Sequence, residues 1–400
     1  MAFKKKFLGA ALAVAAMAFH PSTTLAQAEI KVGGIFDLTG VTADVGKPYA
    51  QGVQDAVAFV NDSGGINGKK IKLIGADYGY KIDQARALYK RLVNDEKVVL
   101  IQGWGSGDTE ALKDFVGQDK IPYYSASFSA PLTDPAKFPY NFFVAPSYSD
   151  GLRSWLNWVK ADYTKGGGKG KAKVAFMFGD NAYGKSPLAA GRKWAAEIGV
   201  DVVDEAVLPP NFQDATSQLL TMKQKGVEYA YIQVTTANVA IVLRDAQKLG
   251  LKVKFGSNPY GFDENLPALA GPNAEGVTGL MPHVPYGTAV PGMKDLMATH
   301  DKVRPTEKGN AMYVRGWTYV MVWSEVLKRA DKAGQLNGPG IKAASETLKD
   351  FSTGGLSQPV TYTPTDHRAS LTSEIFQVQS GKLVKIAEYA LPRTPEWLGL

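Results

Sequence analysis

The sequence predicts an α/β fold made of two doubly wound units that follow one another along the chain. Apolar runs of strand length alternate with amphipathic runs of helix length, and this alternation starts again after Pro146. The 400 residues are also enough for two domains that each bury a core. Strands that alternate with helices form parallel sheets with helices on both faces.

The first unit is expected to contain four strands with helices between them. Val53, Val57 and Val60 recur at i, i+4 and i+7, which gives the expected helix 47–61 an apolar face. Asp83 and Asp108 are expected to cap the next two helices at their N-termini. The expected strands are 30–36, 71–76, 98–101 and 121–125.

The second unit repeats this order after a helix that Asp150 is expected to cap. Its expected strands are 173–178, 200–207, 229–234 and 253–255, with helices at 187–198, 214–225 and 237–249. From Gly276 onward the chain returns to helices, notably 313–330. It ends in an expected hairpin of 374–378 and 383–386 that turns at Ser380 and Gly381. Such a tail completes both units only if the chain crosses between them more than once.

Residues 1–28 are expected to be a signal peptide. Lys4, Lys5 and Lys6 precede an apolar run at 7–19, and Ala26-Gln27-Ala28 supplies a small-x-small cleavage pattern. The alternative is a buried N-terminal helix. Cleavage after Ala28 would yield an exported protein, and no apolar run reaches the roughly 18 residues that a membrane span needs.

Composition excludes several function classes. The chain has no Cys, and its four His are far apart, so neither thiolate chemistry nor a His-based zinc site is expected. The formal charge of +7 includes the three leader lysines. The basic run at 165–171 is glycine-rich and has no aromatic residue within it, so no nucleic-acid partner is expected.

The segment 179–186 matches the phosphate-loop pattern G-x-x-x-x-G-K-[ST] between an expected strand and an expected helix. Export, the bulky Tyr183 inside the loop, and the lack of a clear metal-binding Asp at a neighbouring strand end count against nucleotide binding. We therefore expect no nucleotide, metal or other cofactor.

Several short motifs, taken in order, carry a family resemblance. They are 33–40 (Gly-Gly-Ile-Phe-Asp-Leu-Thr-Gly), 61–68, 103–109, 125–129 and 180–184 (Asp-Asn-Ala-Tyr-Gly). Together they resemble the leucine/isoleucine/valine-binding proteins, which are periplasmic receptors of ABC importers of the branched-chain amino acid type. The resemblance covers nearly all of residues 29–400.

The resemblance implies a type I periplasmic binding protein: two Rossmann-like lobes joined by three hinge crossovers, with ligand in the cleft. It places lobe 1 at 29–146 plus 277–355, and lobe 2 at 147–276 plus 356–400. It also implies a periplasmic monomer that delivers a small-molecule carboxylate to an inner-membrane ABC permease and is not an enzyme.

Ligand-binding residues are expected at the carboxyl ends of the strands, where helix N-termini offer free amides to an anion. Ser106, Thr109, Ser127 and Ser129 resemble the loops that hold the ligand carboxylate in the family, and Tyr183 resembles a tyrosine that reaches the ligand from the second lobe. Capping, turn chemistry and core packing are the alternatives for these residues. The full expected set is Trp104, Ser106, Thr109, Ser127, Phe128, Ser129, Tyr183, Thr235, Asn258 and Tyr260.

Asn258 stands where the amino acid receptors carry a Glu that pairs with the α-ammonium. This departure leaves two ligand classes open, hydrophobic amino acids and aromatic or other organic acids. Asp263 or Glu264 could supply a replacement carboxylate.

Two other functions compete with a transport receptor. An exported amidase or hydrolase would need a nucleophile beside a base, and His283 is the only His near an expected crossover. A periplasmic sensor domain would share the fold and differ only in its partner. The sequence has no attached signalling segment, and we therefore expect a free receptor.

Overall fold

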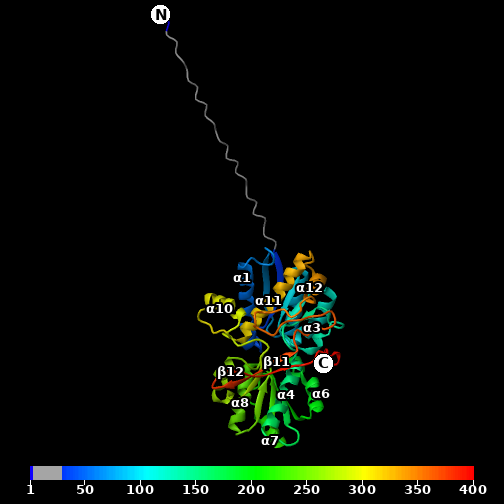
Figure 1. The fold of residues 1–400 in the computed structure, drawn as a ribbon, viewed down its shortest axis with the longest axis vertical. Coiled ribbons are helices and arrows are strands. Elements are labelled where there is room, and N and C mark those ends of the chain that lie inside the picture. Colours follow the sequence, from blue (N-terminus) through cyan, green and yellow to red (C-terminus); the bar gives the residue numbers. More distant parts are fainter. Residues whose placement is uncertain (3–28) are drawn as a thin grey trace.

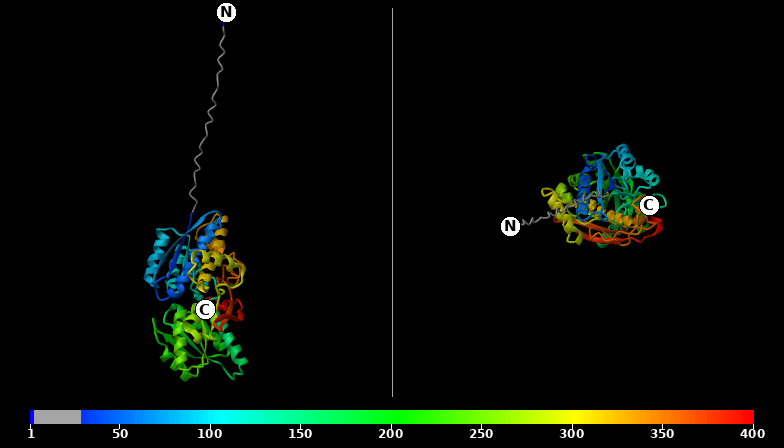
Figure 2. Two further views of the ribbon diagram at one scale, coloured as in Figure 1. Left: turned by 90° about the vertical axis from the view of Figure 1, so that its left-hand side faces the viewer. Right: turned by 90° about the horizontal axis from the view of Figure 1, so that it is seen from above.

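The computed structural model describes residues 1–2 and 29–400. Two bodies lie one above the other, and each is built on its own sheet (Figures 1 and 2). We call the body with the five-stranded sheet the first lobe and the body with the seven-stranded sheet the second lobe. The predicted signal peptide, apart from its first two residues, lies outside the described residues. Among those residues, no helix has the length and apolar character that crossing a membrane requires.

The sheet of the first lobe is parallel and has the order β2-β1-β3-β4-β5. Within it, Val32 of β1 pairs with Leu73 of β2 on one side and with Leu100 of β3 on the other. The strands are β1 (Glu29–Phe36), β2 (Lys70–Asp77), β3 (Leu100–Gly103), β4 (Tyr123–Ser125) and β5 (Asn141–Phe142). The helices are α1 (Ala43–Asp62), α2 (Ile82–Asn94), α3 (Ser106–Asp119), α10 (Pro291–Val303), α11 (Ala311–Lys332) and α12 (Gly338–Ser345), with the 3₁₀ turn η1 (Ala130–Thr133).

Helices α1 and α11 pack closely because each has a glycine at the crossing. A Cβ on Gly52 would lie 2.2 Å from the carbonyl oxygen of Tyr313, and one on Gly316 would lie 2.1 Å from that of Tyr49. No side chain fits in such a gap. The late helix α11 is thereby fixed against the first helix of the chain.

The second lobe has the strand order β12-β11-β10-β9-β8-β6-β7, with β11 and β12 antiparallel. Its strands are β6 (Lys173–Gly179), β7 (Asp201–Leu208), β8 (Tyr229–Gln233), β9 (Lys254–Ser257), β10 (Thr278–Leu280), β11 (Thr372–Gln379) and β12 (Lys382–Ala390). Its helices are α4 (Tyr148–Lys165), α5 (Ala182–Lys185), α6 (Leu188–Ile198), α7 (Thr216–Lys225), α8 (Thr236–Lys248) and α9 (Asn265–Ala270), with η2 (Gly271–Ala274) and η3 (Pro395–Trp397).

The predicted C-terminal hairpin is confirmed. Ser380 and Gly381 have φ values of 51° and 72° between the paired residues Gln379 and Lys382. Positive φ at both central residues is the turn geometry that matches the twist of a two-stranded ribbon.

The predicted N-caps are wrong in detail. Helices α2, α3 and α4 begin before Asp83, Asp108 and Asp150, so that each aspartate lies in a first turn. At α4 the cap is Ser147, whose Oγ accepts from the Asp150 amide at 3.0 Å and donates to its carboxylate at 2.7 Å. An acidic side chain is favourable in a first turn because it faces the positive end of the helix dipole.

The chain crosses between the lobes three times: after β5, after β10 and before β11. Two crossings differ from the predicted boundaries. Strand β10 pairs with β9 and β11, so the chain is still in the second sheet after residue 277. Leu356, Val360 and Tyr362 pack in the first-lobe core, so the last crossing comes well after residue 355. The exact limits of the lobes remain a prediction.

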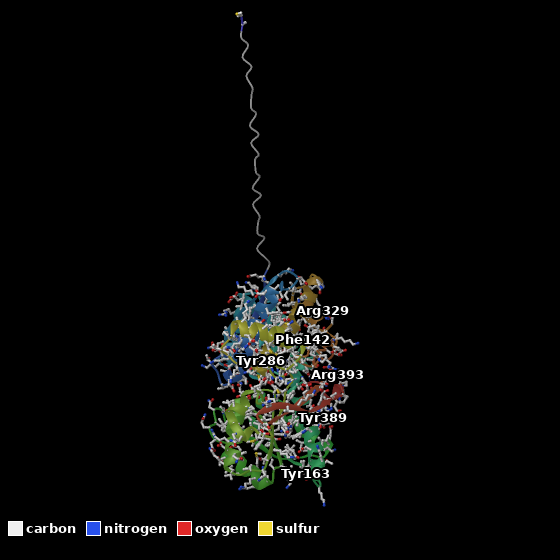
Figure 3. The ribbon with its side chains drawn as sticks, turned by 60° about the vertical axis from the view of Figure 1, so that its left-hand side comes forward. Phe142, Tyr163, Tyr286, Arg329, Tyr389 and Arg393 are labelled. Carbon is white, nitrogen blue, oxygen red and sulfur yellow. The ribbon has the colours of Figure 1, made fainter. Side chains whose placement is uncertain are left out.

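The C-terminal segment returns to the boundary between the lobes. Arg393, labelled in Figure 3 between Arg329 of the upper lobe and Tyr389 of the lower one, pairs with Asp366 at 2.9 Å. Trp397 packs on the buried Arg153, whose guanidinium carbon lies 3.7 Å from the indole centroid. The tail thus covers α4 beside the crossings.

Candidate functional site

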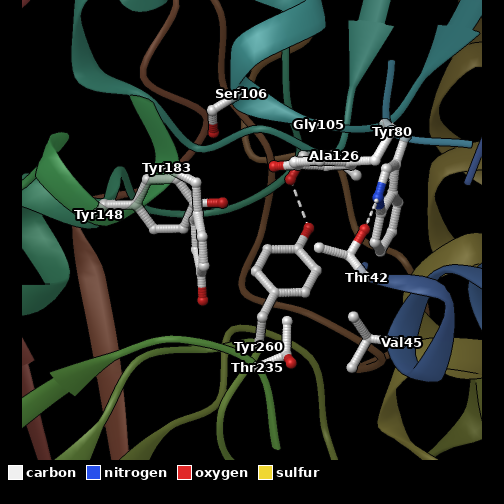
Figure 4. Close-up of a pocket in the computed structure, with 11 residues that line it drawn as sticks. Thr42, Val45, Tyr80, Gly105, Ser106, Ala126, Tyr148, Tyr183, Thr235 and Tyr260 are labelled. Atoms are coloured by element: carbon white, nitrogen blue, oxygen red, sulfur yellow. Dashed lines mark hydrogen bonds between the residues drawn. The ribbon is translucent and has the colours of Figure 1, made fainter. Parts of the chain in front are cut away.

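A cavity with about 260 Å³ of empty space, part of it open to solvent, lies between the two lobes at the carboxyl ends of their parallel strands (Figure 4). This is where open α/β sheets bind ligands, because the loops and helix N-termini converge there. The cavity is lined by Thr42, Val45, Tyr80, Trp104, Gly105, Ser106, Ala126, Tyr148, Tyr183, Thr235 and Tyr260.

The structure places the predicted site residues in two groups. Those that line the cavity are Trp104, Ser106, Tyr183, Thr235 and Tyr260. Those that lie behind its wall are Thr109, Ser127, Phe128, Ser129 and Asn258, all of them buried. Their role in binding remains a prediction.

Sequence reasoning missed six lining residues: Thr42, Val45, Tyr80, Gly105, Ala126 and Tyr148. Each comes within about ten residues after one of the strands β1 to β5. The rule that selected Ser106, applied to the ends of β1, β2 and β5, would have pointed to these loops.

The N-terminus of α3 forms one end of the cavity. Ser106 is the first residue of that helix, and its Oγ accepts a 2.7 Å hydrogen bond from Ser127. Thr109 turns away, since its Oγ1 donates to the Gly105 carbonyl at 2.6 Å. The first amides of a helix have no partner within it and attract negative charge. This end of the cavity is therefore suited to a carboxylate.

Asp108 stands directly behind that helix end. Its Oδ1 accepts from the Tyr78 hydroxyl at 2.7 Å, and within residues 29–400 its Oδ2 has no partner. Burial raises the pKa of Asp108 to about 7, against hydrogen bonds that lower it. At pH 7 this carboxyl group is thus about half protonated.

Aromatic rings form the walls. The Tyr260 ring stacks on Phe128 with centroids 5.5 Å apart and meets Trp104 edge-on at 5.5 Å. Tyr148 meets Tyr183 edge-on at 5.4 Å. Burial raises the pKa of the Tyr148 and Tyr183 hydroxyls well above 10, so both are neutral. Flat apolar walls with few polar groups suit a small hydrophobic ligand.

Asn258 lies behind the cavity wall, and its side-chain amide is bonded on both sides. Its Oδ1 accepts from the Tyr183 hydroxyl at 2.5 Å and from the Tyr260 amide at 2.8 Å. Its Nδ2 donates to the carbonyls of Ile232 at 3.0 Å and Val234 at 2.8 Å. Its Oδ1, the one atom of the side chain that could accept from an ammonium, is therefore already bonded to both wall tyrosines.

Neither Asp263 nor Glu264 lines the cavity. Glu264 accepts from the amides of Tyr286 at 2.6 Å and Ala311 at 2.8 Å, which places it at the N-terminus of α11. Asp263 accepts from the Asn265 amide at 3.0 Å. Burial raises the pKa of Asp263 to about 6 and that of Glu264 to about 7. Both carboxyls accept hydrogen bonds from backbone amides.

Hydrogen bonds join the lobes around the cavity. The Tyr260 hydroxyl donates to the carbonyl oxygen of Ala126, a bond drawn dashed in Figure 4. Ser186 donates to Ser129 at 3.1 Å, and the Ala237 amide donates to Asp44 at 3.4 Å. The structure therefore has the lobes in contact across the cavity.

The segment 179–186 does not form a phosphate cradle. Asn181 caps the four-residue helix α5 by accepting from the Gly184 amide at 2.8 Å, and a Cβ on Gly184 would lie 2.0 Å from the Gly179 carbonyl oxygen. Lys185 pairs with Asp180. In residues 29–400 no group of three or more acidic or His side chains is placed to hold a metal ion.

A family model described as periplasmic binding protein matches residues 29–382. An amino acid binding protein of Pseudomonas aeruginosa is 26% identical over 269 residues, which are 67% of this chain and 70% of that protein. The first curated relatives are matched over 62% to 70% of their own lengths.

Two solved structures are similar over nearly their whole length. An ABC transporter substrate binding protein of Aeropyrum pernix superposes with a TM-score of 0.85 at 28% identity, covering 93% of this chain and 98% of that one. A branched chain amino acid ABC transporter protein of Thermus thermophilus, with bound valine, gives 0.84 at 25% identity, covering 90% and 96%. The resemblance that the sequence motifs carried is thus confirmed, and this chain belongs to the periplasmic binding protein family.

Proposed function

We propose that this protein is the solute receptor of an ABC importer and captures a small carboxylate in the cavity between its lobes. The observation that carries the proposal is the cavity itself, which has a helix N-terminus at one end and aromatic walls from both lobes. Export through the predicted signal peptide, with cleavage after Ala28, would place it in the periplasm as a monomer that meets an inner-membrane permease.

Closure of the lobes is the proposed mechanism of capture. A ligand that touches Ser106 of the first lobe and Tyr183 of the second gains both contacts only in the closed form. Such a ligand shifts the population toward that form by its differential affinity for it.

The names of the similar proteins support a carboxylate ligand. One is an amino acid binding protein, and one solved structure holds valine. Valine carries both a carboxylate and an ammonium group. The α3 N-terminus offers a site for the carboxylate, whereas the Asn258 acceptor oxygen is already engaged and offers no free partner to an ammonium.

Catalysis has weaker support than binding. A hydrolase requires a nucleophile in reach of a general base at the substrate. His283 is buried away from the lining residues, and burial lowers its pKa well below the usual range. A periplasmic sensor domain would use the same cavity and would differ in its membrane partner.

Native mass spectrometry of the protein purified from its own cells tests the proposal. We expect one bound molecule per chain, carrying a carboxylate and released intact on unfolding. Chemically converted product released from the protein would instead support an enzyme. A preparation free of ligand that binds no metabolite extract would contradict the receptor function.

A further inference from the structure

We propose that Arg315 sets the ligand class of the cavity, so that the protein binds carboxylates without an ammonium group in preference to the matching amino acids. This inference rests on the proposed function and specifies its ligand. Arg315 belongs to α11 of the first lobe, and its Nη2 donates to the Pro259 carbonyl, just after β9 of the second lobe, at 3.0 Å. Its side chain therefore reaches from one lobe to the other.

The charge of Arg315 has no counter-ion. Its side chain is 1% exposed, no carboxylate of residues 29–400 lies within ion-pair distance of it, and its Nε and Nη1 have no hydrogen-bond partner there. Two other buried arginines behave differently. Arg153 pairs with Asp150 at 3.2 Å and Arg368 with Asp366 at 2.6 Å. An unpaired buried ion is costly, so an anion supplied from outside would be strongly attracted to it.

The Arg315 guanidinium lies behind the Tyr260 ring, which forms part of the cavity wall. Its central carbon is 4.1 Å from the centroid of Tyr260 and 5.3 Å from that of Phe128. Tyr260 lines the cavity, and the lining residues include no Lys, Arg, Asp or Glu. In a closed site of low dielectric the field of a charge at this distance is weakly screened.

The carboxylates near the cavity each accept hydrogen bonds from groups other than Arg315. Asp37 accepts from Thr42 and Gly40, Asp44 meets the N-terminus of α8, and Asp108 accepts from Tyr78. Burial raises the pKa of Asp44 and of Asp108, which favours their neutral forms.

His283, close enough for Arg315 to act on it, adds no charge to the cavity. Burial and then the Arg315 charge lower its pKa. A ligand carboxylate is thus attracted by the unpaired Arg315 charge behind the wall. A ligand ammonium would be repelled by the same charge and would find no carboxylate among the lining residues.

Calorimetry with matched probes tests the inference. The probes are phenylacetate, its amide phenylacetamide and phenylalanine, with 4-methylpentanoate and leucine as a branched pair. We expect wild type to bind each free acid at least about tenfold more tightly than its amide or amino acid counterpart, because one uncompensated charge contributes on the order of a tenfold change in affinity.

Substitutions of Arg315 test whether this preference for free acids depends on its charge. Arg315→Met should lower the affinity for the acids by at least about tenfold. Its affinity for phenylacetamide should stay within about threefold of the wild-type value. Arg315→Lys keeps the charge and should keep the preference. Lys332→Met, which removes an exposed charge from the end of the same helix, should change neither.

Tighter binding of the amino acid of either pair would overturn the inference, as would an Arg315→Met protein that folds and keeps the acid preference. Should Arg315→Met fail to fold, loss of the acid preference in Arg315→Lys would overturn it. Failure of wild type to bind any of these acids would also overturn it. In that case, a different bound solute found by native mass spectrometry would still support the proposed receptor function.

Discussion

The hydroxyl of Tyr260 in the second lobe donates a hydrogen bond to the carbonyl oxygen of Ala126 in the first. Ala126 follows strand β4, and Tyr260 follows strand β9, so the bond joins the carboxyl ends of the two sheets. The Tyr260 ring also stacks on Phe128 of the opposite lobe. One side chain thus forms a wall of the cavity and a link between the lobes.

Removing the Tyr260 hydroxyl should weaken ligand binding without disturbing the fold. Tyr260→Phe keeps the ring stack and loses one neutral hydrogen bond, which typically contributes about 1 kcal/mol, so affinity should fall by roughly three- to tenfold. Calorimetry measures the change. Tyr229→Phe, which removes a hydroxyl bonded to Asp162 far from the cavity, is the control. Equal affinities of Tyr260→Phe and wild type would show that this bond does not favour the closed form.

A fixed negative charge at the α3 N-terminus should abolish carboxylate binding. Ser106→Asp places a carboxylate where the ligand carboxylate is expected, and repulsion in a desolvated site should reduce affinity by about a hundredfold or more. The melting temperature should change little, since Asp is favourable in a first helical turn. Ser217→Asp in the exposed first turn of α7 is the matched control. Retained binding by Ser106→Asp would move the anion site elsewhere.

Asp108 should make stability fall as pH rises. Its pKa in the folded protein is about 7 and its usual value is 3.8, so the folded state holds an extra proton between these values. Its contribution is therefore fully present below about pH 4 and is lost as pH rises through 7.

Urea unfolding of wild type and Asp108→Asn between pH 4 and 8 measures this contribution. The asparagine keeps an acceptor for Tyr78 and has no charge, so wild type should lose stability relative to the variant as pH rises. Parallel stability curves for the two proteins would mean that Asp108 titrates normally.

Replacing Asn258 should reduce the stability of the fold. Asn258→Asp removes the two donors to the carbonyls of Ile232 and Val234 and places a buried charge against them, which should cost about 3–5 kcal/mol of unfolding free energy. Asn211→Asp at an exposed position should cost little. A normal unfolding free energy together with tighter binding of amino acids would restore Asn258 as an ammonium-facing residue.

The order of strands and helices was predictable because each carries its own signal. Val53, Val57 and Val60 do lie buried along α1, and Ser380 and Gly381 do turn the last hairpin. The first residues of helices were not predictable to that precision. Asp108 and Asp150 are equally good in a cap and in a first turn, so composition does not tell the two positions apart.

Cavity-lining residues were predictable where they come within three residues of a strand end, as Ser106 and Thr235 do, since the topology carries such residues to one edge. Which hydrogen bonds and ion pairs each side chain makes depends on partners far away in the sequence. Asn258 donates to carbonyls more than 20 residues earlier, and the Arg315 guanidinium bonds to the Pro259 carbonyl without meeting any carboxylate of residues 29–400. A linear pattern does not encode either fact.

Small-angle X-ray scattering with and without saturating ligand tests the central claim most directly. A protein stripped of its solute by unfolding and refolding should open at the crossings near Pro146, Leu280 and Leu371. Adding back the solute recovered from the native protein should then lower the radius of gyration, with no change in circular dichroism. Identical scattering curves at saturation, with binding shown by calorimetry in the same sample, would contradict capture by lobe closure.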